Sequence, residues 1–192
     1  VVFTDAGGSA AKQVADIDSL IAQKVDLLVF PPREDKPLIP AVMKAKKAGI
    51  PVILVDRDVD HKLAKPGVDY ITFIGSDFAD QGRRAAQALI KVIGEKGNII
   101  ELEGSTGASA ATDRKKGFDA EIAKHPGLKI VASQSGDFNR DKGRQLAATL
   151  LQAHPDANAI YAHNDEMAVG AITAIEAAGK KPGKDIFLVS ID

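Results

Sequence analysis

Short apolar runs rich in β-branched residues recur along this chain of 192 residues, and no other feature constrains its fold as strongly. Most of these runs are apolar at every position instead of at alternate positions, which is typical of strands covered on both faces of a parallel sheet. Between most of them, apolar residues recur at three- and four-residue spacing, as on the buried face of a helix. Alternating strands and helices predict an α/β fold of βαβ units with right-handed crossovers. The runs expected to form strands are residues 1–4, 25–30, 52–55, 70–74, 98–102, 129–132, 159–161 and 186–191.

Glycine and proline mark the expected ends of the helices. Gly94 and Gly179 each follow a helical pattern, as glycines do when they end a helix. Pro40 is expected in the first turn of the helix that ends near Gly49, because a proline deeper inside would break that helix.

The connection between Val55 and Tyr70 departs from the alternation, since it carries charged residues and a Lys/Pro/Gly loop but no helical pattern. We therefore predict that the strand at 70–74 leads out of a first domain and that residues 75–77 form a hinge into a second. Each domain is predicted to contain a parallel sheet. The two predicted lobes are residues 1–76 and 77–192.

The composition excludes several classes of function. The 25 basic and 26 acidic residues leave a net charge of −1, without the basic surplus that is typical of nucleic-acid-binding proteins. There is no cysteine, which excludes thiolate chemistry, disulfides and cysteine-ligated metal sites. No apolar run approaches the roughly 20 residues that a membrane-spanning helix needs.

Familiar catalytic and cofactor motifs are also missing. No glycine-rich dinucleotide fingerprint follows a strand, and there is no Gly-x-Ser-x-Gly nucleophile turn. The four histidines do not have metal-ligand spacing. Only His163 lies at a predicted strand end, where it could act as a general base, but no nucleophile partner is evident. We therefore predict a protein that is not an enzyme and that uses no cofactor and no metal.

Polar residues gather at the predicted carboxyl ends of the strands, the edge at which open parallel sheets bind ligands. They are Asp5, Asp56, Arg57, Ser76, Asp77, Ser105, Thr106, Gln134, Ser135, His163, Asn164, Asp165 and Asp192. Aspartate accepts hydrogen bonds, arginine donates through a planar fork and asparagine does both, which suits the hydroxyls of a polyol. Phe138, in a predicted turn, could cover the apolar face of a sugar ring.

Each of these candidates also has a simpler explanation. Asp56 and Arg57 could form a surface ion pair, and Asn164 could cap the following helix. Phe138 could belong to the core, which is the more common place for phenylalanine. The stretch 112–114 could be a solvated helix face. The ligand-binding interpretation depends on several candidates falling at the same edge of the predicted sheets.

Seven short motifs, each weak alone, form a strong signal through their joint order and spacing. They are Val55-Asp56-Arg57, Glu103-Gly104-Ser105-Thr106-Gly107-Ala108-Ser109, Asp113-Arg114-Lys115-Lys116-Gly117-Phe118, Ser133-Gln134-Ser135-Gly136-Asp137-Phe138, Tyr161-Ala162-His163-Asn164-Asp165-Glu166-Met167, Lys181-Pro182-Gly183-Lys184-Asp185 and Ser190-Ile191-Asp192. Over essentially its whole length, the chain resembles the periplasmic sugar-binding proteins of ABC transporters. Among them it is most similar to the ribose-binding type and, within that type, to the galactofuranose-binding branch.

The resemblance implies a type I periplasmic binding protein fold, in which two doubly wound parallel-sheet lobes, each incomplete in this chain, close on a monosaccharide. It also implies that Phe138 faces the sugar ring while polar residues hydrogen-bond its oxygens. The implied sugar-binding residues are Asp56, Arg57, Arg114, Phe138, Asn164 and Asp192, with Ser105, Thr112 and Asp113 as second-tier candidates.

The resemblance further implies a monomer that delivers its sugar to the membrane permease of an ABC transporter and binds no nucleic acid. The expected location is the periplasm, or the outside of the membrane in a Gram-positive cell. The family has an opening strand and helix before the position of Val1 and a long stretch after Asp192, so we expect a chain cut at both ends. The alternative is the sugar-responsive effector domain of a LacI-type transcription repressor, which shares the fold.

Overall fold

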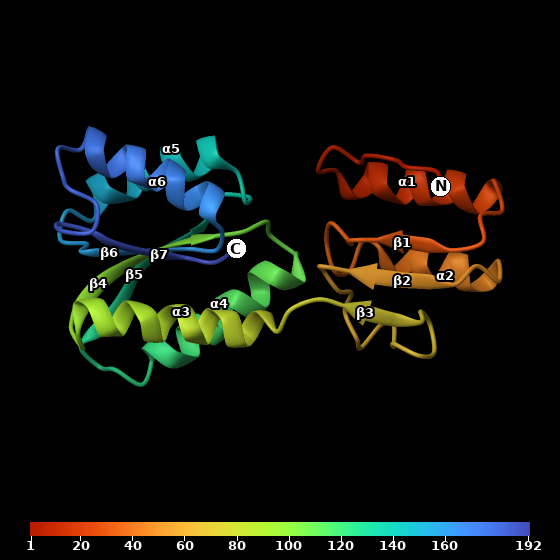
Figure 1. The fold of residues 1–192 in the computed structure, drawn as a ribbon, viewed down its shortest axis with the longest axis horizontal. Helices are drawn as coiled ribbons and strands as arrows, with labels where there is room; N and C mark the ends of the chain where they lie inside the picture. Colours follow the sequence, from red (N-terminus) through yellow and green to blue (C-terminus); the bar gives the residue numbers. More distant parts are fainter. The chain divides into compact units, whose positions relative to one another are not determined.

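The computed structural model describes residues 1–192, which form six α-helices and seven β-strands (Figure 1). The chain divides into two compact units. The first contains Val1–Ser76 and Gly107–Ala110, and the second contains Asp77–Thr106 and Ala111–Asp192. Every pair of neighbouring strands is parallel, so the predicted α/β class with parallel sheets is confirmed.

A three-stranded sheet lies at the centre of the first unit. Its strands β1 (Leu28–Phe30), β2 (Val52–Val55) and β3 (Thr72–Ile74) pair in that order. The helices α1 (Ala10–Ala22) and α2 (Ile39–Lys47) bury apolar residues in a common core with β2. Pro40 lies in the first turn of α2, as predicted, because a proline there removes no hydrogen bond of the helix.

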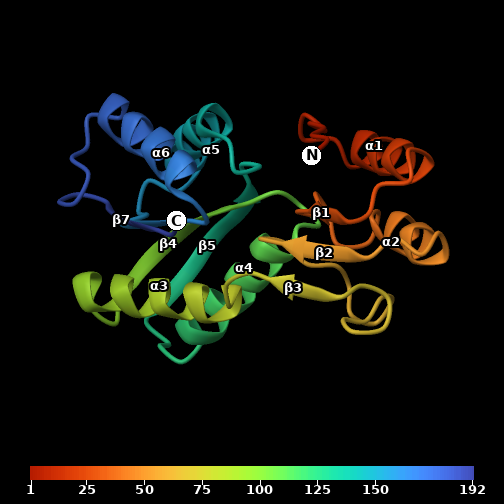
Figure 2. The same ribbon diagram turned by 45° about the vertical axis from the view of Figure 1, so that its right-hand side comes forward.

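A four-stranded sheet with the order β5-β4-β6-β7 lies at the centre of the second unit. Its strands are β4 (Gly97–Glu103), β5 (Leu128–Ser135), β6 (Ala159–Ala162) and β7 (Phe187–Ser190). On one face lie the helices α3 (Phe78–Ile93) and α4 (Ser109–Ile122), and on the other α5 (Arg140–Ala153) and α6 (Asp165–Ala177) (Figures 1 and 2).

Alternate residues of β4 supply the cores on the two faces of this sheet. Ile100 and Leu102 pack with residues of α5 and α6, whereas Ile99 packs with residues of α3 and α4. Glu101 shares the side of Ile99, because side chains alternate along a strand, and there it meets Lys115 of α4. Both faces of the sheet are therefore covered, which explains why the strand sequences are apolar throughout.

Two glycines allow the backbones of α3 and α4 to touch. A Cβ on Gly82 would lie 2.0 Å from the carbonyl oxygen of Arg114, and a Cβ on Gly117 would lie 1.9 Å from that of Ala79. No side chain fits at such distances. This contact fixes the position of the α4 segment that carries Arg114.

Two strand predictions need correction. Residues 1–4 form no strand, and Val1, Val2 and Phe3 are exposed. A strand exists only where a neighbour pairs with its backbone, and no strand of this structure pairs with residues 1–4. Conversely, Gln134 and Ser135 were expected beyond a strand but are the last residues of β5, because β5 pairs with β4 as far as Ser135 opposite Glu103.

The six helices can be compared in length and hydropathy with a membrane-spanning helix. None of the helices combines the length and the apolar character that crossing a membrane requires.

Candidate functional site

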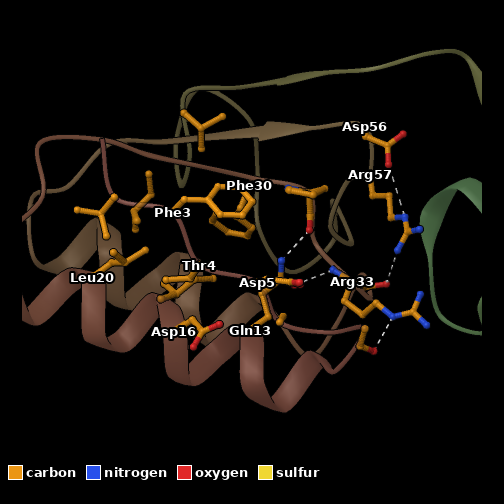
Figure 3. Close-up of a pocket in the computed structure, with 17 residues that line it drawn as sticks. Phe3, Thr4, Asp5, Gln13, Asp16, Leu20, Phe30, Arg33, Asp56 and Arg57 are labelled. Atoms are coloured by element: carbon orange, nitrogen blue, oxygen red, sulfur yellow. Dashed lines mark hydrogen bonds and ion pairs between the residues drawn. The ribbon is translucent and has the colours of Figure 1, made fainter.

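The first unit presents Asp56 and Arg57 directly after β2 (Figure 3). Asp56 has φ +59°, in the left-handed region that costs most residues about 1–2 kcal/mol. Its N–H donates to the carbonyl oxygen of Ile74 at 2.9 Å, so β3 holds the turned backbone in place. Unfavourable backbone conformations persist where the surrounding structure holds them in place, and they cluster at ligand sites. The conformation of Asp56 therefore favours a functional role at this strand end.

Arg57 reaches across the same edge toward the loop after β1. One of its terminal nitrogens lies 3.4 Å from the carbonyl oxygen of Arg33, and its Nε lies 3.6 Å from a carboxylate oxygen of Asp56. The simple ion-pair explanation is thus present in the structure, although the pair is long and Asp56 is exposed. Such exposed pairs contribute little to stability. The ion pair alone therefore does not account for the placement of both groups at this strand end.

Gln13 and Arg33 complete this part of the first unit, and neither is among the predicted site residues. The backbone N–H of Arg33 donates to Oε1 of Gln13 at 2.8 Å, while the amide of Gln13 donates to the carbonyl oxygen of Pro31 at 2.8 Å. Figure 3 shows both side chains beside Asp5, Asp56 and Arg57 around a cavity of 380 Å³. Arg33 follows the end of β1 by three residues, so the rule that located Asp56 could have found it.

Arg114 is the central buried cation of the second unit, with 9% of its surface exposed. Its Nε donates to Oε1 of Gln81 at 3.0 Å, and a terminal nitrogen donates to the carbonyl oxygen of His163 at 2.7 Å. Its guanidinium carbon lies 5.3 Å from the ring centre of Phe78 and 6.0 Å from that of Phe138, within the range of cation–π attraction. These contacts pre-organise the guanidinium, and they exclude a purely solvated face for residues 112–114.

Phe138 stands on a second stretch of left-handed backbone, since Asp137 has φ +59° and Phe138 has φ +55°. The hydroxyl of Ser135 accepts from the N–H of Asp137 at 3.2 Å and donates to the carbonyl oxygen of Gly104 at 2.6 Å, which ties this turn to the end of β4. The ring is partly buried against the core beside α5 and α6. Phe138 therefore packs on the core while also facing Arg114.

Asn164 caps α6, as one of the alternatives predicted. Its Oδ1 accepts from the N–H of Met167 at 3.1 Å. Its Nδ2 makes only a long contact of 3.4 Å to the carbonyl oxygen of Phe138. The cap uses the oxygen and fixes the side chain, so the amide nitrogen is the atom that a ligand could use.

The remaining candidates differ in exposure. Asp192 and Thr112 are exposed, Asp113 is intermediate, and Ser105 is buried. Burial fits Ser105 to a structural role at the end of β4 as well as to a ligand contact. The structure alone assigns no ligand role to these four residues.

His163 lies fully buried at the end of β6 and has both ring nitrogens engaged. Its Nδ1 accepts from the N–H of Gly104 at 3.1 Å, and its Nε2 lies 3.1 Å from a carboxylate oxygen of Glu101. A backbone N–H can only donate, so Nδ1 carries no proton and Nε2 donates to Glu101. This arrangement gives no support to the general-base hypothesis, because neither nitrogen is open to a substrate.

Glu101 anchors a charged cluster beneath this edge of the sheet. Lys115 lies 2.5 Å from Glu101 and 3.2 Å from Asp119. Burial alone would raise the pKa of Glu101, but hydrogen bonds from His163 and Lys115 outweigh it and lower the pKa below its ordinary value. Burial and the charge of Glu101 together raise the pKa of Asp119. Glu101 is thus held as a carboxylate inside the protein.

Comparison with known proteins gives one consistent result. The family model described as a periplasmic binding protein domain matches residues 1–192. The chain is 42% identical over 184 residues to the galactofuranose-binding protein YtfQ of Escherichia coli (strain K12), covering 94% of this chain and 57% of the relative. It is 38% identical over 192 residues to the ribose import binding protein RbsB of Bacillus subtilis (strain 168), covering 100% of this chain and 59% of the relative.

Solved structures agree with the sequence relatives. A protein of Mycobacterium smegmatis in complex with β-D-fucofuranose superposes with a TM-score of 0.93 at 46% identity, covering 100% of this chain and 63% of that chain. The chain therefore spans less than two thirds of the length of each of these relatives. The predicted family resemblance and fold are confirmed.

Proposed function

The chain belongs to the periplasmic binding protein family, and we propose that the protein it comes from is the sugar-binding component of an ABC importer. The observation that carries this proposal is the setting of Arg114, a buried guanidinium held by two neutral oxygens beside the ring of Phe138. Such a pre-organised donor beside an aromatic face suits the hydroxyls and the C–H face of a monosaccharide. The ligand class is a galactofuranose-like sugar or another pentose or hexose.

Each proposed contact follows from the chemistry of its side chain. Arg57 and Arg114 donate to sugar oxygens, Asp56 accepts from hydroxyls, and Phe138 covers the ring. Buried polar partners make such a site selective, because a sugar that leaves them unpaired binds poorly. The proposed sugar-binding residues are Asp56, Arg57, Arg114, Phe138, Asn164 and Asp192, supported at a second tier by Ser105, Thr112 and Asp113.

The biological setting follows from the same proposal. The protein would be a monomer that works outside the cytoplasmic membrane, hands its sugar to a membrane permease, binds no nucleic acid and catalyses no reaction. The relatives named above are import or sugar-binding proteins, which favours transport over the repressor effector domain. The coding sequence upstream separates the two, since a signal peptide fits transport and a helix-turn-helix segment fits a repressor.

Calorimetric titration of the full-length protein with galactofuranose, galactose, arabinose and ribose tests the sugar claim. Heat of binding with at least one of them is expected, and no heat with any would refute it. Arg114→Ala should weaken binding by about 1–3 kcal/mol, the cost of leaving a buried partner unpaired. The matched control is Arg83→Ala, which removes an arginine paired with Asp80 on α3 and should leave affinity unchanged.

A further inference from the structure

His163 contacts Arg114 and Gly104 through different atoms and directly precedes Asn164 in the chain. We propose that His163 is a positioning residue, which holds Arg114 and Gly104 in the geometry that sugar binding needs. This inference rests on the proposed function. The side chain itself is fully buried, so it acts through its neighbours and not by touching the sugar.

The first contact is the hydrogen bond from Arg114 to the carbonyl oxygen of His163, at 2.7 Å. The direction of a carbonyl depends on the rotation of its peptide unit. The imidazole of the same residue is tethered at both nitrogens, to Gly104 and to Glu101, so rotation of the residue is restrained. The tether therefore sets where Arg114 finds its acceptor.

The second contact is the bond from the N–H of Gly104 to Nδ1 of His163. The ring of Phe138 lies against Gly104. The position of Gly104 therefore determines where that ring lies. The chain then continues from His163 into Asn164, the cap of α6. His163 thus links Arg114 through its carbonyl oxygen, Gly104 through its imidazole and Asn164 through the chain.

The charged groups around the ring explain why a neutral histidine suits this place. Glu101 and Glu103 approach from β4, and Arg114, Lys115 and Asp119 come from α4. Lys115 balances the carboxylates, so the ring needs to supply only one donor to Glu101 and one acceptor to Gly104. Tyr161 packs against the imidazole, with ring centres 5.0 Å apart.

Two substitutions of His163 distinguish the effect of its hydrogen bonds from the effect of its side-chain volume. Glutamine ends in one acceptor and one donor, so His163→Gln can keep both tethers, whereas His163→Leu fills the space but keeps neither. We expect His163→Leu to lower sugar affinity by about tenfold to a hundredfold, and His163→Gln to stay within about threefold. Tyr161→Phe, a change in the adjacent buried ring, is the control and should leave affinity unchanged.

Measuring the effect of His163→Leu both in the wild type and in an Arg114→Ala protein distinguishes positioning of Arg114 from general damage. If His163 acts partly through Arg114, His163→Leu should lose less affinity in an Arg114→Ala protein than in the wild type. Equal losses in both backgrounds would overturn the proposal, and so would a folded His163→Leu protein with wild-type affinity.

A measurement on the sugar-free wild-type protein covers the case in which His163→Leu does not fold. Nitrogen NMR should show the His163 proton on Nε2 and hindered rotation of the Arg114 guanidinium. A proton on Nδ1, or a freely rotating guanidinium, would refute the positioning role. A wild-type protein with these signals that binds no sugar would instead refute the proposed function and leave the positioning of Arg114 supported.

Discussion

The ring of Phe138 lies so close to the backbone of Gly104 that a Cβ added there would come 2.0 Å from the ring. Only glycine leaves room for this approach. The ring proposed to cover the sugar can therefore take its position only because residue 104, at the end of β4, has no side chain.

Gly104→Ala should consequently weaken sugar binding. The added methyl group must displace the ring of Phe138, and the expected loss of affinity is tenfold or more, about 1.4 kcal/mol or greater. Calorimetric titration measures it. Gly179→Ala is the matched control, because Gly179 has φ +73° with open space around it. That change should cost about 1 kcal/mol of folding stability and no affinity. Unchanged affinity in Gly104→Ala would contradict the placement of Phe138.

The left-handed backbone of Asp56 predicts a conflict between stability and binding. Asp56→Gly relieves the backbone and should raise the free energy of unfolding by up to about 1 kcal/mol, or at least not lower it. It also removes the carboxylate, so sugar affinity should fall. Denaturant unfolding and titration measure the two effects separately.

Lys24→Gly provides the comparison for Asp56→Gly. Lys24 has φ +55° just after α1 and is not a site candidate, so its replacement should stabilise the protein and leave affinity unchanged. A destabilised Asp56→Gly protein, or one that binds sugar normally, would remove the argument that function preserves the conformation of Asp56.

Much of the fold could be predicted because burial on both faces of a sheet leaves a direct trace in the sequence. The runs at 52–55 and 159–161 became β2 and β6 with little change. Strand ends were harder, since Gln134 and Ser135 are strand residues only because β4 pairs with them. The division into lobes at 1–76 and 77–192 stays a prediction.

The site was predictable only where position along a strand carried the signal. Asp56 and Arg57 follow a strand in the sequence, whereas the role of Arg114 came from the family resemblance alone. The network around Glu101 could not be foreseen, because Lys115 and Ser133 come from different elements and meet only in the folded chain. The positive φ of Asp56 likewise could not be predicted from the presence of an aspartate at that position.

The pKa shifts in that network predict opposite pH dependences. The lowered pKa of Glu101 contributes stability that is present above its ordinary value of 4.5 and is lost as the pH falls through the folded value. The raised pKa of Asp119 contributes stability that is present below its ordinary value of 3.8 and is lost as the pH rises through the folded value. Near neutral pH, the cost of ionising Asp119 in the folded state therefore opposes folding.

Asp119→Asn should raise the free energy of unfolding near neutral pH, and the gain should shrink as the pH falls toward 3.8. Urea unfolding across this range measures it. Asp18→Asn, at a partly exposed ion pair with Lys44, is the control and should change stability little at any pH. A loss of stability in Asp119→Asn at neutral pH would show that the pair with Lys115 outweighs burial.

Leu150 tests the core of the second unit apart from the proposed site. It is 4% exposed and lies on α5, in the core that α5 and α6 form with β4 and β6, and it is not a proposed ligand contact. Leu150→Ala should lower the free energy of unfolding by about 2–5 kcal/mol, because it removes buried methyl groups and leaves a cavity. The folded fraction should still bind sugar with near wild-type affinity, the reverse of Arg114→Ala. Leu63→Ala, at a position 54% exposed, should change the free energy of unfolding and the sugar affinity little. If Leu150→Ala weakened binding as much as Arg114→Ala at equal folded fraction, the separation of the core from the site would be wrong.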